Sequence, residues 1–316
     1  MSRGARSQSL VLIAPEQMEW VERDLPPIGE RDVLVETRSG AISIGTELPL
    51  YRGVARSSAP ARYPRMTGYE SVGIVVARGA AVHHVREGDR VVSTYGHQTR
   101  AVVPASRAAV VPPDVDDELA VLLVLSGDVA TGARRLGAAL REAVLVTGAG
   151  EIGLLAIWVL LRLGVPAVDV VEPRAERRDL AWRLGARLAV PPDAASDLAP
   201  AYAGGVECSA RDAAFALLQE RMRPGGRICV LSDGNVEPLT LAPAFHEQQL
   251  TVVGSSDCPD YRAHADWYFD VLRGGEHALA QLFDQHVTAG ELPGTFAALA
   301  DGSLTAIKVF VRYGAG

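Results

Sequence analysis

The sequence contains few cysteines. Only Cys208, Cys229 and Cys258 occur among its 316 residues, and no two of them are spaced as a CxxC pair. Three scattered thiols can form neither a disulfide framework nor a four-cysteine metal site. We therefore expect a protein of a reducing compartment, the cytoplasm.

Long apolar runs and an excess of positive charge are also absent. LVLIA at 10–14 is too short for the core of a signal peptide, and no other apolar run is long enough to span a bilayer. The formal net charge is −7, whereas nucleic acids and anionic membranes select a basic face. The composition therefore predicts neither nucleic acid nor membrane as a partner and leaves a small-molecule substrate.

The chain is longer than one ordinary hydrophobic core usually spans, so we expect two domains. Short apolar segments with glycine and proline between them fill the first third, among them VLVET at 33–37, SVGIVVA at 71–77 and DRVVS at 89–93. Such close-spaced strands predict a compact β domain. We place this domain at 1–116 and 257–316, with a second domain at 117–256.

The second domain alternates strand and helix patterns. DDELAVLLVLSGDVATGARRLGAAL at 116–140 predicts a long helix, and RPGG at 223–226 predicts a turn. Six strands are expected at AVLVT (143–147), AVDVVE (167–172), RLAV (187–190), GGVECS (204–209), RICVLS (227–232) and LTVVGS (250–255). Repeated alternation of this kind predicts an α/β fold with a doubly wound parallel sheet.

A glycine-rich motif follows the first of these strands. Gly148, Gly150 and Gly153 form G-x-G-x-x-G at the start of an apolar helix, the fingerprint of a dinucleotide site. The motif predicts cofactor contacts from its own segment and from the ends of neighbouring elements: Thr131, Thr147, Gly148, Gly150, Glu151, Ile152, Gly153, Ser209, Ser232 and Ser255. The alternative is a glycine-rich turn in a domain that binds no nucleotide.

The cofactor preference depends on Glu172, at the end of the second strand. A carboxylate there accepts hydrogen bonds from ribose hydroxyls and repels a 2′-phosphate, which favours NAD(H) over NADP(H). Arg174 and Arg177 are further candidates for cofactor contact, and they leave open a pairing with the extra phosphate. Arg178 is expected on a solvated helix face.

An ordered set of motifs resembles the medium-chain dehydrogenase/reductase superfamily, which includes the zinc alcohol dehydrogenases. The motifs are GTE (45–47), GYESVG (68–73), EGDRVV (87–92), VTGAGEIG (146–153) and AIKVFV (306–311). ISIGTEL (42–48) and YGHQTRAVVP (95–104) are most similar to bacteriochlorophyllide a dehydrogenase-like members. The resemblance implies a GroES-like catalytic domain, a Rossmann domain, NAD(P)-dependent hydride transfer, and a homodimer formed through the last Rossmann strand.

The sequence departs from this family at the positions of the zinc ligands. Ile44 stands where zinc-dependent members carry cysteine, Tyr69 stands in place of their histidine, and Asp128 is the nearest acid to the third position. A catalytic zinc usually takes three protein ligands. We therefore expect an enzyme without zinc or any other metal.

A side chain must then assist the substrate oxygen. The resemblance gives Thr46 the position of the family's proton-passing hydroxyl and Tyr69 the position of a metal ligand, while Ser43, His97 and Asp128 are further catalytic candidates. Tyr69 has an equally weighted alternative as a space-filling residue bonded to Glu70 or to backbone. Glu70 is expected to be structural and paired with an arginine.

Three functions remain open at this point. The first is an NAD-dependent alcohol dehydrogenase or ketone reductase without zinc. The second is an NAD(P)H-dependent enoyl or quinone reductase, whose chemistry needs less help at the oxygen. The third is a non-catalytic nucleotide-binding protein on a reductase fold.

Overall fold

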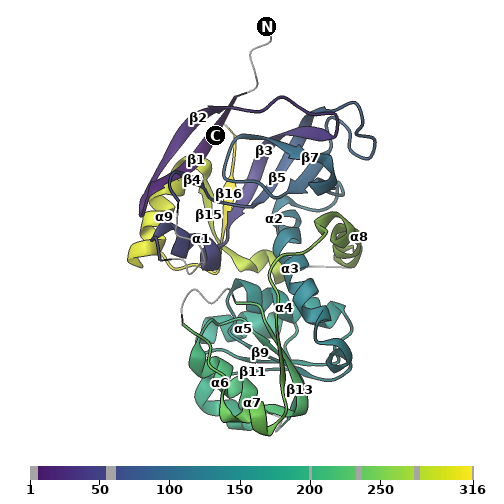
Figure 1. Cartoon of the computed structure of the whole chain (residues 1–316), viewed down its shortest axis with the longest axis vertical. Coiled ribbons are helices and arrows are strands. Elements are labelled where there is room, and N and C mark those ends of the chain that lie inside the picture. Colours follow the sequence, from purple (N-terminus) through teal and green to yellow (C-terminus); the bar gives the residue numbers. More distant parts are fainter. Residues whose placement is uncertain (1–5, 55–61, 199–200, 233–236, 274–277, 315–316) are drawn as a thin grey trace. The chain divides into compact units, whose positions relative to one another are not determined.

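The chain forms two compact units (Figure 1). The computed structural model describes residues 6–54, 62–198, 201–232, 237–273 and 278–314. The first unit spans 1–124, 260–275 and 283–316, and the second spans 125–259 and 276–282. The β-rich first unit and the parallel sheet of the second confirm the predicted fold class.

The first unit is built on two sheets. The smaller has the order β2–β1–β4, and the larger has the order β15–β16–β3–β5–β6–β8, with β7 also paired to β3. Their strands are β1 Arg6–Ala14, β2 Gln17–Asp24, β3 Asp32–Ile42, β4 Arg65–Met66, β5 Glu70–Arg78, β6 Arg90–Ser93, β7 Arg100–Pro104, β8 Ala109–Val110, β15 Phe283–Thr288 and β16 Lys308–Arg312.

The strand β3 shows why this sequence forms a sheet. Val35 and Thr37 are buried, whereas Glu36 and Arg38 are exposed to solvent. This alternation is the period-2 pattern of a half-buried strand. The predicted strand at 33–37 is confirmed, and the observed strand continues to Ile42, directly before the helix α1, Ile44–Tyr51.

The first unit also contains helices that the sequence pattern did not predict. These are α1, together with α8, Tyr261–Leu272, and α9, Leu292–Asp301. The Tyr268 hydroxyl of α8 donates to the Leu119 carbonyl at 2.6 Å, and Phe296 of α9 packs on Tyr51 with ring centroids 5.5 Å apart. These helices are stabilised by tertiary burial more than by local propensity.

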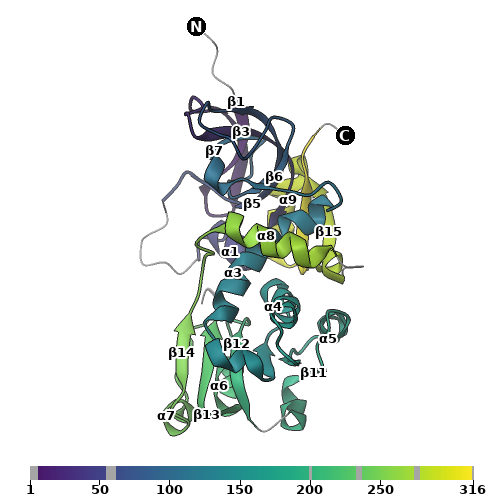
Figure 2. The same ribbon diagram turned by 90° about the vertical axis from the view of Figure 1, so that its right-hand side faces the viewer.

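The second unit is a doubly wound parallel sheet of six strands, in the order β11–β10–β9–β12–β13–β14. The helices α4 and α5 pack on the β9–β11 half of the sheet, and α6 packs against β9, β12 and β13. Figure 2 shows β14 at the outer edge of the sheet. The elements are β9 Val144–Thr147, α4 Glu151–Arg162, β10 Val168–Val171, α5 Ala175–Arg183, β11 Leu188–Val190, β12 Tyr202–Glu207, α6 Asp212–Glu220, β13 Met222–Val230, α7 Pro243–Glu247 and β14 Thr251–Gly254.

The helical pattern predicted at 116–140 is confirmed in three segments, whereas the continuity of that helix and the turn predicted at RPGG were wrong. The single helix expected at 116–140 is divided into α2, Asp117–Val121, α3, Leu123–Arg134, and a short 3-10 helix, Gly137–Arg141. RPGG lies within β13, where Gly225 has a φ of +73° and the pairing with β12 shifts register. Glycine tolerates this backbone, so the strand accommodates the irregularity. Over the described residues, no helix is long and apolar enough to cross a membrane.

Candidate active site

The loop between β9 and α4 has the geometry of a phosphate cradle. Gly148 has a φ of +85°, and a Cβ there would stand 2.9 Å from Ser209. A Cβ at Gly153 would stand 1.9 Å from the Gly148 carbonyl oxygen, so only glycine fits this turn. Gly150 is the N-cap of α4, which places the positive end of the helix dipole at the loop. Glu151 and Ile152 form the first turn of α4.

Glu172 lies directly after β10 and is 4% exposed. Its two carboxylate oxygens accept hydrogen bonds from the backbone N–H groups of Ala149, at 2.6 Å, and Arg174, at 3.0 Å. The carboxylate is therefore fixed beside the glycine loop. Each oxygen can accept a second hydrogen bond, so the group still has room for ribose hydroxyls.

The arginines near Glu172 have different surroundings. Arg178 donates to the carbonyl oxygens of Glu172 and Pro173, at 2.9 and 2.7 Å, so it anchors the loop as well as facing solvent. The Arg177 guanidinium lies 3.7 Å from the position that a Cβ would take on Gly150. Arg177 therefore stands over the loop, where its charge complements a phosphate.

Predicted contact residues gather at the carboxyl ends of the parallel strands, where doubly wound sheets bind ligands. The hydroxyls of Ser209 and Ser232 both donate to the carboxylate of Glu207, a residue to which the sequence pattern assigned no role. Among the described residues, the buried hydroxyl oxygens of Thr147 and Ser255 have no hydrogen-bond partner. Two such orphaned groups at this edge fit a polar ligand. Thr131 lies half-buried on α3.

In the first unit, the Tyr69 hydroxyl donates to Ser43 Oγ at 2.6 Å. Ser43 is the N-cap residue of α1, but its side chain makes no capping bond and is available to Tyr69. The structure therefore brings together two of the predicted catalytic residues. A space-filling Tyr69 bonded to Glu70 or to backbone was the alternative prediction, and Ser43 is one partner that the structure gives this hydroxyl. Thr46 lies half-buried in the first turn of α1.

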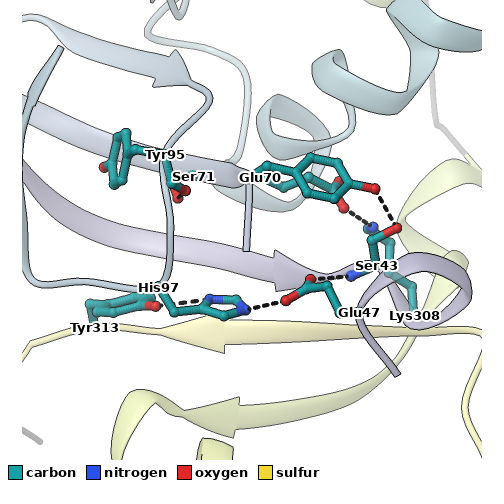
Figure 3. Close-up of polar contacts among 9 residues, drawn as sticks. Ser43, Glu47, Glu70, Ser71, Tyr95, His97, Lys308 and Tyr313 are labelled. Carbon is teal, nitrogen blue, oxygen red and sulfur yellow. Dashed lines mark hydrogen bonds and ion pairs between the residues drawn. The ribbon is translucent and has the colours of Figure 1, made fainter. Parts of the chain in front are cut away.

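His97 is held on both sides of its ring (Figure 3). Its Nε2 lies 3.0 Å from Glu47 Oε2, and its Nδ1 lies 3.2 Å from the Tyr313 hydroxyl. Glu47 Oε1 in turn accepts the Ser43 N–H at 2.8 Å. His97 and Glu47 are each 1% exposed, so His97 supports the Ser43 segment and is engaged at both nitrogens. Burial raises the pKa of Tyr313 well above its usual range, so its phenol stays protonated.

Glu70 forms a buried ion pair with Lys308, with Oε1 and Nζ 2.8 Å apart (Figure 3). The partner expected from the sequence was an arginine, so that prediction was wrong in residue type. Burial raises the pKa of Glu70, and the Lys308 ammonium opposes that shift. The pair joins the start of β5 to the start of β16. Among the described residues, the second carboxylate oxygen of Glu70, Oε2, is buried and has no hydrogen-bond partner.

Asp128 is placed in the second unit, and its Oδ1 accepts the Cys258 N–H at 2.7 Å. The side chains at the family's ligand positions are thus an aliphatic Ile44, a phenol bonded to Ser43, and an acid bound to backbone. Within the described ranges, no group of three His, Cys, Asp or Glu side chains is placed to hold a metal. This donor set does not fit a catalytic zinc.

Sequence reasoning missed the roles of four polar residues: Glu47, Glu207 and Lys308, which are buried, and Tyr313, which is half-buried. Each is a polar residue inside or beside an apolar segment, and this is the signal that could have identified them. A buried polar or charged group needs hydrogen-bond partners, so the presence of each of these residues in an apolar segment indicates a hydrogen-bond network. The identity of the partners was not readable, because most lie far away in the chain.

Residues 29–113 match the family model described as the alcohol dehydrogenase GroES-like domain. An L-threonine 3-dehydrogenase of Anaeromyxobacter dehalogenans is 31% identical over 266 residues, which cover 71% of this chain and 76% of the relative. The L-threonine 3-dehydrogenase of Pectobacterium atrosepticum is 29% identical over 274 residues, covering 74% and 75%. A solved short chain alcohol dehydrogenase from E. coli CFT073, complexed with NADH, superposes with a TM-score of 0.82 at 20% identity, covering 98% of this chain and 100% of that one.

Proposed function

We propose a function for this chain that starts from its family: it belongs to the medium-chain dehydrogenase/reductase superfamily and is an NAD(P)-dependent oxidoreductase. The proposed reaction is transfer of a hydride between NAD(H) and an alcohol or ketone without a catalytic zinc. The observation that carries this proposal is the hydrogen bond from Tyr69 to Ser43 Oγ. The resemblance gives Tyr69 the position of a metal ligand, and Ser43 directly precedes Ile44, which has the position of another. A phenol and a hydroxyl together can supply the proton that a metal-bound oxygen would otherwise handle. The non-catalytic hypothesis is not kept, because the relatives that match most of the chain at about 30% identity are dehydrogenases.

The protein's part in the reaction is to place a proton at the substrate oxygen. A nicotinamide cofactor, when bound, supplies or accepts the hydride. Hydroxyl hydrogens rotate, so Ser43 can donate to Tyr69 while Tyr69 donates to a developing alkoxide. Glu47 holds the backbone N–H of Ser43 and thereby keeps this pair in place. Thr46 is the second hydroxyl that we assign to the substrate oxygen.

The cofactor that we propose is NAD(H). The glycine loop and Arg177 would hold the pyrophosphate, and Glu172 would accept the ribose hydroxyls. A 2′-phosphate would meet the negative charge of Glu172 in a buried setting, where repulsion is poorly screened.

Two finer assignments remain proposals. The motif ISIGTEL supports a place near the bacteriochlorophyllide a dehydrogenase-like members. All three cysteines are free thiols, which agrees with a cytoplasmic location.

The test is product analysis with each nicotinamide cofactor and with a panel of ketones, secondary alcohols including L-threonine, enones and quinones. We expect turnover of an alcohol–ketone pair, no stoichiometric zinc by elemental analysis, and activity that chelators leave unchanged. One zinc ion per chain that activity requires would overturn the metal-free proposal. Saturation of an enone with no reaction at ketones would instead identify an enoyl reductase.

A further inference from the structure

Glu207 is a fully buried carboxylate at the carboxyl end of β12. Its Oε1 accepts hydrogen bonds from the backbone N–H groups of Ser209 and Ala210, at 2.7 and 3.1 Å, and from the Ser209 hydroxyl. Its Oε2 accepts from the Ser232 hydroxyl. All four of these donors, which come from the described residues, are neutral N–H or O–H groups, so their dipoles stabilise the carboxylate.

These donors belong to two different segments of the second unit. Ser209 and Ala210 follow β12, and Ser232 follows β13. The backbone strengthens the connection, because the N–H groups of Leu231 and Ser232 donate to the Glu207 carbonyl at 2.9 and 3.2 Å. One side chain therefore joins two loops at the edge of the sheet where ligands bind in this fold.

The first of these loops lies against the phosphate cradle. A Cβ on Gly148 would stand 2.9 Å from both Cα and Cβ of Ser209, so the two backbones are in direct contact. The Cys208 N–H donates to the Thr147 carbonyl at 2.9 Å, directly before the glycine loop. A shift of the Ser209 turn would therefore displace Gly148.

We propose that Glu207 is a positioning residue for the nicotinamide cofactor: its carboxylate holds the turns at Ser209 and Ser232 in the shape that supports the glycine loop. The inference rests on the cofactor use described above. In this arrangement, the hydroxyls of Ser209 and Ser232 direct their hydrogens to Glu207. Each of these two hydroxyls has used its hydrogen on Glu207, so it can only accept further hydrogen bonds, through its oxygen lone pairs.

The test compares Glu207→Gln with a matched buried carboxylate, Asp169→Asn. Asp169 is also fully buried in the same sheet. Its carboxylate accepts hydrogen bonds from the Arg187 guanidinium and from the Tyr202 hydroxyl, the second at 2.6 Å. Asp169 pairs with Leu145 within the sheet, before the carboxyl ends of the strands. We expect both variants to lower the unfolding temperature, and only Glu207→Gln to weaken NADH binding, by about 10-fold, the usual effect of losing a hydrogen bond to a charged group.

Ser232→Ala provides a second, milder variant in case Glu207→Gln does not fold. It removes one donor and should weaken binding about 3-fold, less than the loss of the charge itself. An NADH dissociation constant within 2-fold of the unchanged protein in both variants would overturn the inference. If the unchanged protein binds NADPH more tightly than NADH, the same comparison is made with NADPH. That preference would refute the role proposed for Glu172, and the test of Glu207 would still apply.

Discussion

At the scale of single residues, the hydroxyl of Tyr69 is the group on which the proposed chemistry depends. Tyr69→Phe removes that hydroxyl and keeps the ring, so cofactor affinity and thermal stability should change little. Turnover should fall about 10²–10⁴-fold, the usual contribution of a positioned acid or base. Steady-state kinetics with an authentic substrate pair checks this.

A matched control exists in the same unit. Tyr51→Phe also removes a tyrosine hydroxyl, one that donates to the Glu16 carbonyl at 3.0 Å, and it should leave turnover unchanged. Near-normal turnover in Tyr69→Phe would identify that tyrosine as a packing residue. His97 would not replace it directly, since Glu47 and Tyr313 occupy its ring nitrogens.

Glu172 is the residue that should decide the cofactor preference. We expect NADH to bind more tightly than NADPH, and Glu172→Ala to narrow the difference, because the variant removes both the ribose acceptor and the charge that opposes a 2′-phosphate. Titration of cofactor fluorescence measures both constants. Glu176→Ala, an exposed acid on α5, makes the same charge change and should leave the preference as it is. Tighter binding of NADPH than of NADH to the unchanged protein would show that attraction of the 2′-phosphate by Arg174 or Arg177 outweighs its repulsion by Glu172.

At the scale of elements, the β9–α4 loop depends on a backbone that only glycine adopts without cost. Gly148→Ala adds a Cβ at a φ of +85° and 2.9 Å from Ser209. We expect the strain of a left-handed residue, about 1–2 kcal/mol of stability, together with weaker cofactor binding as the loop shifts. Denaturant unfolding and NADH titration measure the two effects.

Gly164 separates backbone strain from the effect on the cradle. It follows α4 with a φ of +90°, and nothing lies within 4 Å of its would-be Cβ. Gly164→Ala should therefore lose similar stability and keep its NADH affinity. If the Gly148→Ala protein bound NADH as tightly as the Gly164→Ala protein, the β9–α4 loop would not be a phosphate site.

At the scale of the whole molecule, we propose a homodimer formed through β14. This strand is an edge of the six-stranded sheet, and an unpaired edge favours pairing with another chain. Light scattering at micromolar concentration should give the mass of two chains. Thr251→Lys, on the exposed face of β14, should shift the mass toward one chain through repulsion between the two-fold mates.

The opposite edge strand supplies the control for this prediction. Leu188→Lys places the same charge at the exposed first residue of β11, Leu188–Val190, and should leave the mass unchanged. A monomeric mass for the unchanged protein would contradict the proposed assembly.

The sequence by itself determined the features that depend on local pattern. Period-2 and period-3.6 hydrophobicity predicted the β-rich segment and the alternating sheet, because side-chain burial on one face follows directly from backbone geometry. The spacing of Gly148, Gly150 and Gly153 predicted the cradle, because the turn needs residues without a Cβ. The resemblance gives positions 44 and 69 to two of the family's metal ligands, and the sequence shows isoleucine and tyrosine there instead of cysteine and histidine.

Only the tertiary structure decided which buried polar groups meet. Glu70 and Lys308 are 238 positions apart, and His97 and Tyr313 are 216 apart, so no local pattern could pair them. In the sequence, Glu207 is an acid inside an apolar strand. The positioning role that we propose for it depends on the turns at Ser209 and Ser232, which the fold brings to its carboxylate. A buried charge requires partners wherever the chain supplies them, and the fold alone determines where that is.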